Sequence, residues 1–191
     1  APLVGGDLSR TSGPLVVCVA AIGEVAGKHA LRRYRGRPGD LVLVSGELGG
    51  AAAGLEILRR GERTPSALVQ RLLRPSPRVE LGYALAASHL VRSAADISDG
   101  LGRDAMHVAG PGCSAHLRTR DLPIPRQLPR VAEHLGMSTV DLALAGGEDF
   151  ELVLAVAPRH VDAVRALAHR HGERLSVVGH IARGRGLFVD D

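Results

Sequence analysis

The chain has 191 residues, a formal net charge of +4 and a hydrophobic content of 45%, which is enough to build one domain and part of another. Aromatic residues make up only 2% and Trp is absent, so there is no stacking platform for single-stranded nucleic acid. The basic residues are scattered and no apolar run reaches about 18 residues, so neither a nucleic acid nor a membrane is an expected partner.

The two cysteines and the first residues bear on the origin of the chain. Cys18 and Cys113 lack the spacing of a metal site or a redox pair, so we expect two reduced thiols in a cytoplasmic protein. No basic and then apolar leader opens the chain, which starts at Ala1 without an initiator Met. We therefore expect a fragment of a longer protein.

The expected elements begin with an apolar run over 14–23, which predicts the last strand of a domain whose beginning is missing. A Pro-Gly turn at 37–40 precedes a core strand over 40–46. Apolar positions at helical spacing predict helices over 48–60, 66–73, 79–91, 101–108 and 158–171. Further strands are predicted over 95–99, 114–117, 150–156, 176–181 and 187–189.

This alternation of helices and strands predicts an α+β fold, an α/β sandwich with a mixed sheet. The boundary falls near residue 37. Residues 1–36 are then the end of a first domain, and residues 37–191 form a second, α+β domain.

Three motifs place carboxylates beside glycine: Gly5-Gly-Asp7, Asp96-Ile-Ser-Asp-Gly100 and Gly146-Gly-Glu-Asp149. Glycine permits tight turns and a close approach of ligand to backbone, and carboxylates bind the Mg²⁺ that accompanies phosphates. Together the motifs indicate a nucleotide and metal site. Each also has a structural alternative: a generic turn for the first, a capped helix start for the second, and a turn into an edge strand for the third.

Two other features carry less chemistry. The glycines of 45–54 do not have the spacing of a dinucleotide or phosphate loop, and we expect them to allow close packing of a helix on the sheet. The histidines show no metal-binding spacing, so His107, His160, His169 and His180 are expected on the surface or on helix faces.

Further motifs occur in a fixed order with these three, notably Arg37-Pro-Gly-Asp40, Leu72-Leu-Arg-Pro-Ser-Pro-Arg78 and Ala143-Leu-Ala-Gly-Gly-Glu-Asp-Phe-Glu-Leu152. Together they resemble the thiamine-monophosphate kinase family over essentially the whole chain. The resemblance implies a homodimer that transfers the γ-phosphate of ATP to thiamine phosphate with Mg²⁺. It also implies that 37–191 resembles the C-terminal domain of aminoimidazole ribonucleotide synthetase (PurM), preceded by the last strand of an N-terminal PurM-like domain.

The resemblance also implies roles for single residues. The implied nucleotide contacts are Gly6, Asp7, Arg33 and Ser98, the implied Mg²⁺ ligands are Asp7, Asp96 and Asp99, and the implied thiamine phosphate contact is Glu148. No catalytic side chain is expected, because the attacking phosphate oxygen is already anionic and needs no strong base. We expect the three aspartates to lie within a few ångströms of one another in an acidic cleft.

Two alternatives to this function remain open. One is another small-molecule kinase or synthetase of the same ATP-binding superfamily, and the other is a non-catalytic nucleotide-binding fragment. Members of the resembling family carry further Mg²⁺ ligands in an N-terminal stretch that this chain lacks. We therefore expect that the 191 residues do not catalyse the reaction by themselves.

Overall fold

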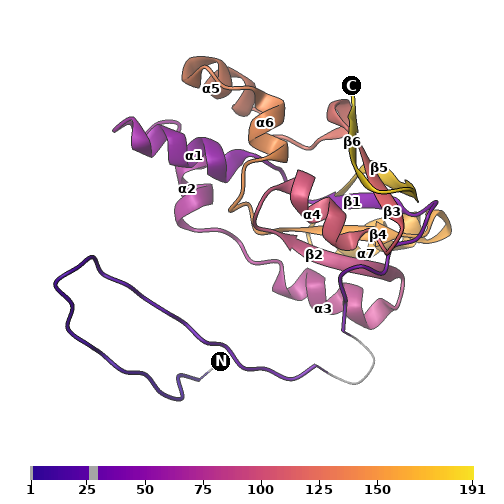
Figure 1. The fold of residues 1–191 in the computed structure, drawn as a ribbon, viewed down its shortest axis with the longest axis horizontal. Helices are drawn as coiled ribbons and strands as arrows, with labels where there is room; N and C mark the ends of the chain where they lie inside the picture. Colours follow the sequence, from indigo (N-terminus) through magenta and orange to yellow (C-terminus); the bar gives the residue numbers. More distant parts are fainter. Residues whose placement is uncertain (1, 26–29) are drawn as a thin grey trace.

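A six-stranded sheet forms the centre of the structure, a computed structural model that describes residues 2–25 and 30–191 (Figure 1). Its strands lie in the order β2-β4-β1-β5-β3-β6. They are β1 (Leu41–Ser45), β2 (Val91–Ile97), β3 (Cys113–Arg118), β4 (Glu151–Val156), β5 (Leu175–Arg183) and β6 (Gly186–Asp190). All neighbours pair antiparallel except β3 and β6, which are parallel. The mixed sheet confirms the predicted α+β class.

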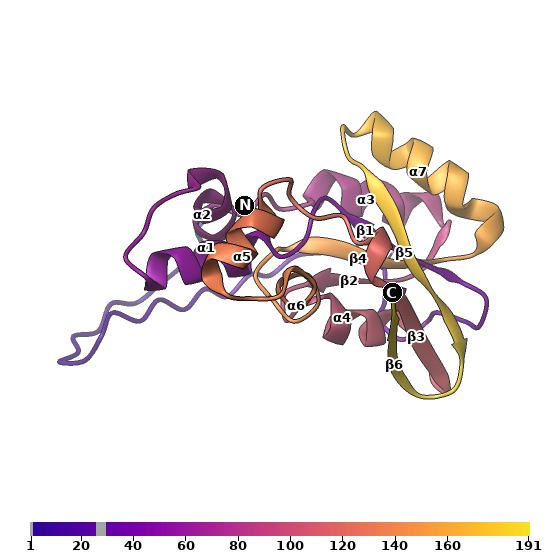
Figure 2. The same cartoon turned by 90° about the horizontal axis from the view of Figure 1, so that it is seen from above.

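Helices cover both faces of this sheet. α4 (Leu101–Val108) lies on one face, and α3 (Val79–Ser88) and α7 (Val161–Arg170) lie on the other (Figure 2). The central strand β1 serves both layers, because Val44 packs in the α4 core while Leu43 packs in the α3/α7 core. This is the side-chain alternation expected of a strand buried on both faces.

A third group of helices stands at one end of the sheet (Figure 1). It contains α1 (Gly50–Arg59), α2 (Ser66–Leu73), α5 (Leu128–Leu135) and α6 (Thr139–Leu144). These helices share their own buried cluster, which includes Ile57, Leu68 and Leu142. The glycines before and within α1 serve this helix packing: a Cβ on Gly54 would lie 2.4 Å from the Leu68 carbonyl of α2. The expected close packing is thus against a helix rather than the sheet.

The segment 2–25 differs from its prediction. It forms no helix or strand, is exposed throughout, and runs as a long open loop outside the sheet and helices (Figure 1). The strand expected over 14–23 is therefore not formed in this structure. The apolar run that predicted it is present, with Leu15, Val17 and Ile22 exposed, but a strand needs a hydrogen-bonded neighbour and the described residues place none beside it.

The other differences concern boundaries. The helix predicted over 79–91 ends at Ser88, and β2 begins at Val91, earlier than the predicted start at 95. β4 is an interior strand between β2 and β1, so the edge-strand alternative for the segment after Asp149 is wrong. Over the described part of the chain, no helix combines the length and apolar character needed to span a membrane.

Candidate functional site

Within the motif Asp96 to Gly100, Asp96 and Ile97 end β2, and Ser98 to Gly100 form a bend that leads into α4. A Cβ on Gly100, whose φ is +100°, would lie 2.7 Å from the carbonyl oxygen of Leu144, so the bend requires glycine there. The helix-cap alternative for Asp99 is not what the structure shows. Instead, the buried Asp104 carboxylate accepts the backbone N–H groups of Ser98 at 3.0 Å and Asp99 at 3.1 Å.

Arg33 reaches this bend from a segment that precedes β1. Its Nη2 lies 2.9 Å from Oδ1 of Asp96, and both side chains are about half exposed. The segment is fixed to the domain by backbone hydrogen bonds, from Ala94 N to the Arg32 carbonyl and from Tyr34 N to the His107 carbonyl. Two of the expected site residues, Arg33 and Asp96, are therefore side by side.

The Gly146 to Asp149 motif forms a loop that lies directly against the bend. Glu148 N donates to the Ser98 carbonyl at 3.0 Å, and Phe150 N donates to the Ile97 carbonyl at 2.9 Å. Glu148 has φ +67°, and a Cβ on Gly147 would lie 2.3 Å from the Ser98 oxygen. Two motifs some fifty residues apart thus form one continuous surface, which brings Glu148 next to Ser98.

The three expected metal ligands are not gathered. Asp7 lies in the exposed extended segment, and Asp99, also exposed, has its Oδ2 3.1 Å from Nη1 of Arg103. Within residues 2–25 and 30–191, no group of three or more His, Cys, Asp or Glu side chains could hold a metal ion. The expected acidic cleft of three aspartates is not formed in this structure. Asp96 and Asp99, each paired with an arginine, would supply only part of a Mg²⁺ site.

Asp149 turns away from the bend and caps a helix. Its Oδ2 accepts from Gly49 N at 2.7 Å and its Oδ1 from Ala51 N at 3.2 Å, so it occupies the N-terminus of α1. Burial raises the pKa of Asp149 to about 6, although the two backbone hydrogen bonds act in the opposite direction. Its role in the structure is to hold the loop against α1.

Glu151, the last acidic residue of the motif, is also structural. It is only 3% exposed and receives both Nε and Nη2 of Arg78, at 2.7 and 2.5 Å. The Ser45 hydroxyl donates to its Oε2 at 2.5 Å. The hydrogen bond to Glu151 raises the pKa of the Arg78 guanidinium, which also pairs with Glu173. This network fastens the start of β4 to β1 and to the segment before α3.

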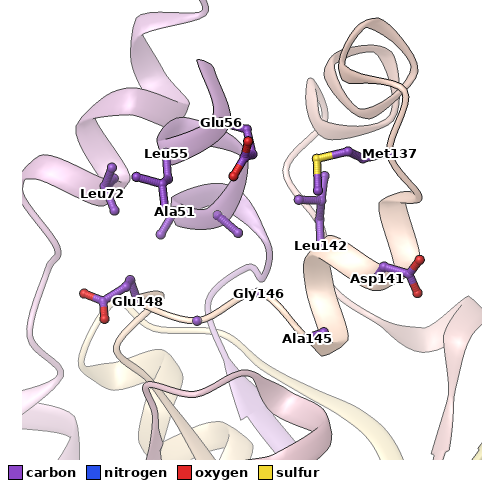
Figure 3. Close-up of a pocket in the computed structure, with 12 residues that line it drawn as sticks. Ala51, Leu55, Glu56, Leu72, Met137, Asp141, Leu142, Ala145, Gly146 and Glu148 are labelled. Atoms are coloured by element: carbon purple, nitrogen blue, oxygen red, sulfur yellow. The ribbon is translucent and has the colours of Figure 1, made fainter. Parts of the chain in front are cut away.

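A cavity of about 340 Å³ lies between α1, α2, α6 and the Gly146 loop (Figure 3). Apolar side chains line most of it, among them Leu55, Leu72, Met137 and Leu142. The Glu56 carboxylate points into the space between α1 and α6, and Glu148 lies at the lower rim in Figure 3, whereas the Asp141 carboxylate points outward. None of the described lining residues is basic. The cavity suits an apolar group that carries positive charge.

Local sequence patterns did not reveal the roles of Asp104, Asp149 and Arg78. A signal for Asp104 does exist, since an Asp in the first turn of a helix after a glycine bend is typical of a capping role. Asp149 and Arg78 act on partners about 100 and 73 residues away, respectively, and no local pattern identifies such partners.

The sheet, its helical layers and the joined bend and loop define an α+β domain with a polar site at the end of the β2 and β4 ladder. Residues 37–191 match the family described as AIR synthase related protein, C-terminal domain. The chain belongs to this family.

Several similar proteins and solved structures are thiamine-monophosphate kinases. A thiamine-monophosphate kinase of Caulobacter vibrioides is 34% identical over 195 residues, which cover 97% of this chain and 53% of the relative. The crystal structure of thiamine-monophosphate kinase from Stenotrophomonas maltophilia has a TM-score of 0.76 at 38% identity, covering 85% of this chain and 53% of that one. AaThiL complexed with AMPPCP and TMP has a TM-score of 0.70 at 32% identity, covering 81% and 48%. The chain spans about half the length of the curated relatives it matches.

Proposed function

We propose that this chain forms the second domain of an ATP-dependent kinase that moves the γ-phosphate of ATP directly onto thiamine phosphate, giving thiamine diphosphate. The names of its relatives support this proposal, as does the neighbour solved with AMPPCP and TMP. The structural observation that carries it is the apolar cavity beside Glu148. Thiamine phosphate has a cationic thiazolium ring. An apolar pocket that is edged by carboxylates, and of whose described lining residues none is basic, suits such a group.

The proposed roles follow the geometry of the bend and loop. We assign Arg33, which pairs with Asp96, and Ser98 to the nucleotide side, and Glu148, which lines the cavity, to the acceptor. The hydrogen bond from Glu148 N to the Ser98 carbonyl keeps the two sides in register, and such positioning is the main contribution that a protein makes to phosphoryl transfer. The acceptor phosphate is the nucleophile, so no general base is assigned.

The proposal also includes Mg²⁺, a domain boundary and a cellular location. Asp96 and Asp99 from the folded domain and Asp7 from the extended segment would hold Mg²⁺, which would neutralise charge on the phosphates. Gly6 and Asp7 would lie against the ATP phosphates. That set requires a different course for residues 2–25 from the one in this structure. The domain boundary at residue 37 and a cytoplasmic location belong to the same proposal.

A homodimer is also proposed. The exposed apolar side chains of the extended segment support it, because such a stretch is normally covered by a partner surface. The side chains concerned are Leu15, Val16, Val17, Val19 and Ile22.

Glu148→Gln tests the acceptor cavity in the intact gene product. Removing the carboxylate charge at its rim should raise KM for thiamine phosphate about tenfold, while KM for ATP changes less than about twofold. Steady-state ADP formation measures both constants. Glu133→Gln, at an exposed position on α5, is the matched control and should leave both constants unchanged. An unchanged acceptor KM in a well-folded Glu148→Gln protein would remove Glu148 and its cavity from the proposal.

A further inference from the structure

Asp104 is the buried acid at the centre of the candidate site, and no role was expected for it. Its side chain is 1% exposed although it lies in the first turn of α4. One carboxylate oxygen accepts the amides of Ser98 and Asp99, and the other lies 3.1 Å from Nδ1 of His107. Both carboxylate oxygens of Asp104 are therefore directed at specific groups.

The arrangement is costly for a residue that only caps its own helix. An exposed first-turn Asp interacts favourably with the helix dipole without losing its hydration. Asp104 instead reaches back past the helix start to two amides of the preceding bend, and these hydrogen bonds replace the water that a buried carboxylate loses. The buried carboxylate therefore fixes the positions of two backbone amides outside its own helix.

Hydrogen bonds fix both backbone polar groups of Ser98. Its N–H is bonded to Asp104 and its carbonyl accepts from Glu148 N at 3.0 Å. The amide of Asp99 is fixed by the same carboxylate oxygen. The backbone that carries the Ser98 and Asp99 side chains is therefore held by Asp104 on one side and by Glu148 N on the other.

A second connection runs through His107 to the nucleotide side. The His107 ring bonds Asp104, and the His107 carbonyl accepts from Tyr34 N at 2.7 Å. Tyr34 adjoins Arg33, whose guanidinium returns to Asp96 at 2.9 Å. These contacts link the bend to α4, α4 to the segment that carries Arg33, and Arg33 to Asp96 at the end of β2.

We propose that Asp104 is a positioning residue that sets the Ser98–Asp99 bend in register with Arg33 on one side and Glu148 on the other. It acts through hydrogen-bond acceptance and touches no substrate. The inference rests on the proposed kinase function for its effect on turnover, whereas its effect on the bend is independent of that function.

Three variants of the intact gene product test this role. Asp104→Ala removes both acceptors, and Asp104→Asn retains one oxygen that can accept both amides. Asp162→Ala, at an exposed first-turn position of α7, is the matched control. If Asp104→Ala does not fold, Asp104→Ser replaces it, since a hydroxyl on the shorter side chain still loses most of the contact.

Amide hydrogen exchange followed by NMR provides the readout that does not depend on activity. In Asp104→Ala, the amides of Ser98 and Asp99 should exchange at least about tenfold faster, while amides of the β1 core remain as in the parent protein. Asp104→Asn and Asp162→Ala should leave residues 98 and 99 protected. Unchanged exchange at both amides in Asp104→Ala would overturn the proposal.

Kinetics provide the second readout. Asp104→Ala should lower kcat about 30-fold with KM for ATP changed less than about threefold, and Asp104→Asn should restore kcat to within about threefold. Equal activity in the Ala and Asn proteins, whether normal or lost, would contradict a role through hydrogen-bond geometry. A parent protein without kinase activity would instead overturn the proposed function, and the exchange data would still decide what Asp104 does to the bend.

Discussion

Single carboxylates within one short motif have separate tasks in this protein. Glu148 faces the cavity, Asp149 caps α1, and Glu151 is buried against Arg78. The backbone has a positive φ at two positions here, +67° at Glu148 and +50° at Phe150. These turns direct neighbouring side chains toward different parts of the fold. Only Glu148 remains available for a ligand.

Asp149 makes the stability of the fold depend on pH. Its pKa is raised from 3.8 to about 6, so the folded state binds the proton more tightly than the unfolded state. Its contribution to the free energy of unfolding is therefore largest at low pH and falls as pH rises through the interval from about 4 to about 6. Relative to Asp149→Asn, the parent protein should lose about 2 kcal/mol across that interval.

Urea unfolding of both proteins at several pH values between about 4 and 7 measures this difference. Asp162→Asn serves as the control, because that exposed first-turn Asp has the same chemistry without the burial. Parallel pH curves for the parent and Asp149→Asn would show that Asp149 does not titrate in this range.

At the scale of elements, the Arg78–Glu151 pair joins three parts of the fold that are distant in sequence. Gly46, which follows β1, leaves room for it: with φ +58°, a Cβ there would lie 2.0 Å from Glu151 Oε1. Gly39 also has a positive φ, +90°, but nothing lies within 4 Å of its Cβ position. The two glycines thus share a backbone constraint and differ in what surrounds them.

Alanine at each glycine separates the two effects. Gly39→Ala should cost about 1 kcal/mol, the strain of a positive φ. Gly46→Ala should cost about 4 kcal/mol, because it also displaces Glu151 from Arg78 and leaves a buried charge without its partner. Chemical denaturation gives both values. Equal losses for the two proteins would mean that the pair adapts to the added methyl group.

Most helices and strands with a clear local pattern of apolar residues were predicted correctly, and two helices were missed. The apolar runs of β1 and β4 and the periodicity of α2 and α4 indicated these elements correctly. α5 and α6 were missed, since α5 contains Pro129 near its start and α6 has only six residues. The apolar run over 14–23 predicted a strand from composition alone, although strand formation depends on a neighbour that a single run cannot reveal.

The candidate site was predictable to a similar extent. The bend at Asp96 and the loop at Gly146 were both identified, and the β2–β4 register, with Ile97 opposite Glu151, explains why they meet. The tasks of Asp104 and Asp149 were not identified, because they follow from bonds to backbone amides that only the fold brings close.

At the scale of the whole molecule, the folded domain presents the bend, the loop and the cavity beside Glu148, while Gly6 and Asp7 lie on the extended segment. We propose that these parts serve direct transfer of the γ-phosphate to thiamine phosphate. ATP labelled with ³²P at the γ position, incubated with the intact gene product, Mg²⁺ and thiamine phosphate, tests it most directly. We expect the label in thiamine diphosphate, in a one-to-one ratio with ADP, and in no product when aminoimidazole ribonucleotide precursor or selenide replaces thiamine phosphate. Label released as inorganic phosphate, or transferred only to another acceptor, would contradict it.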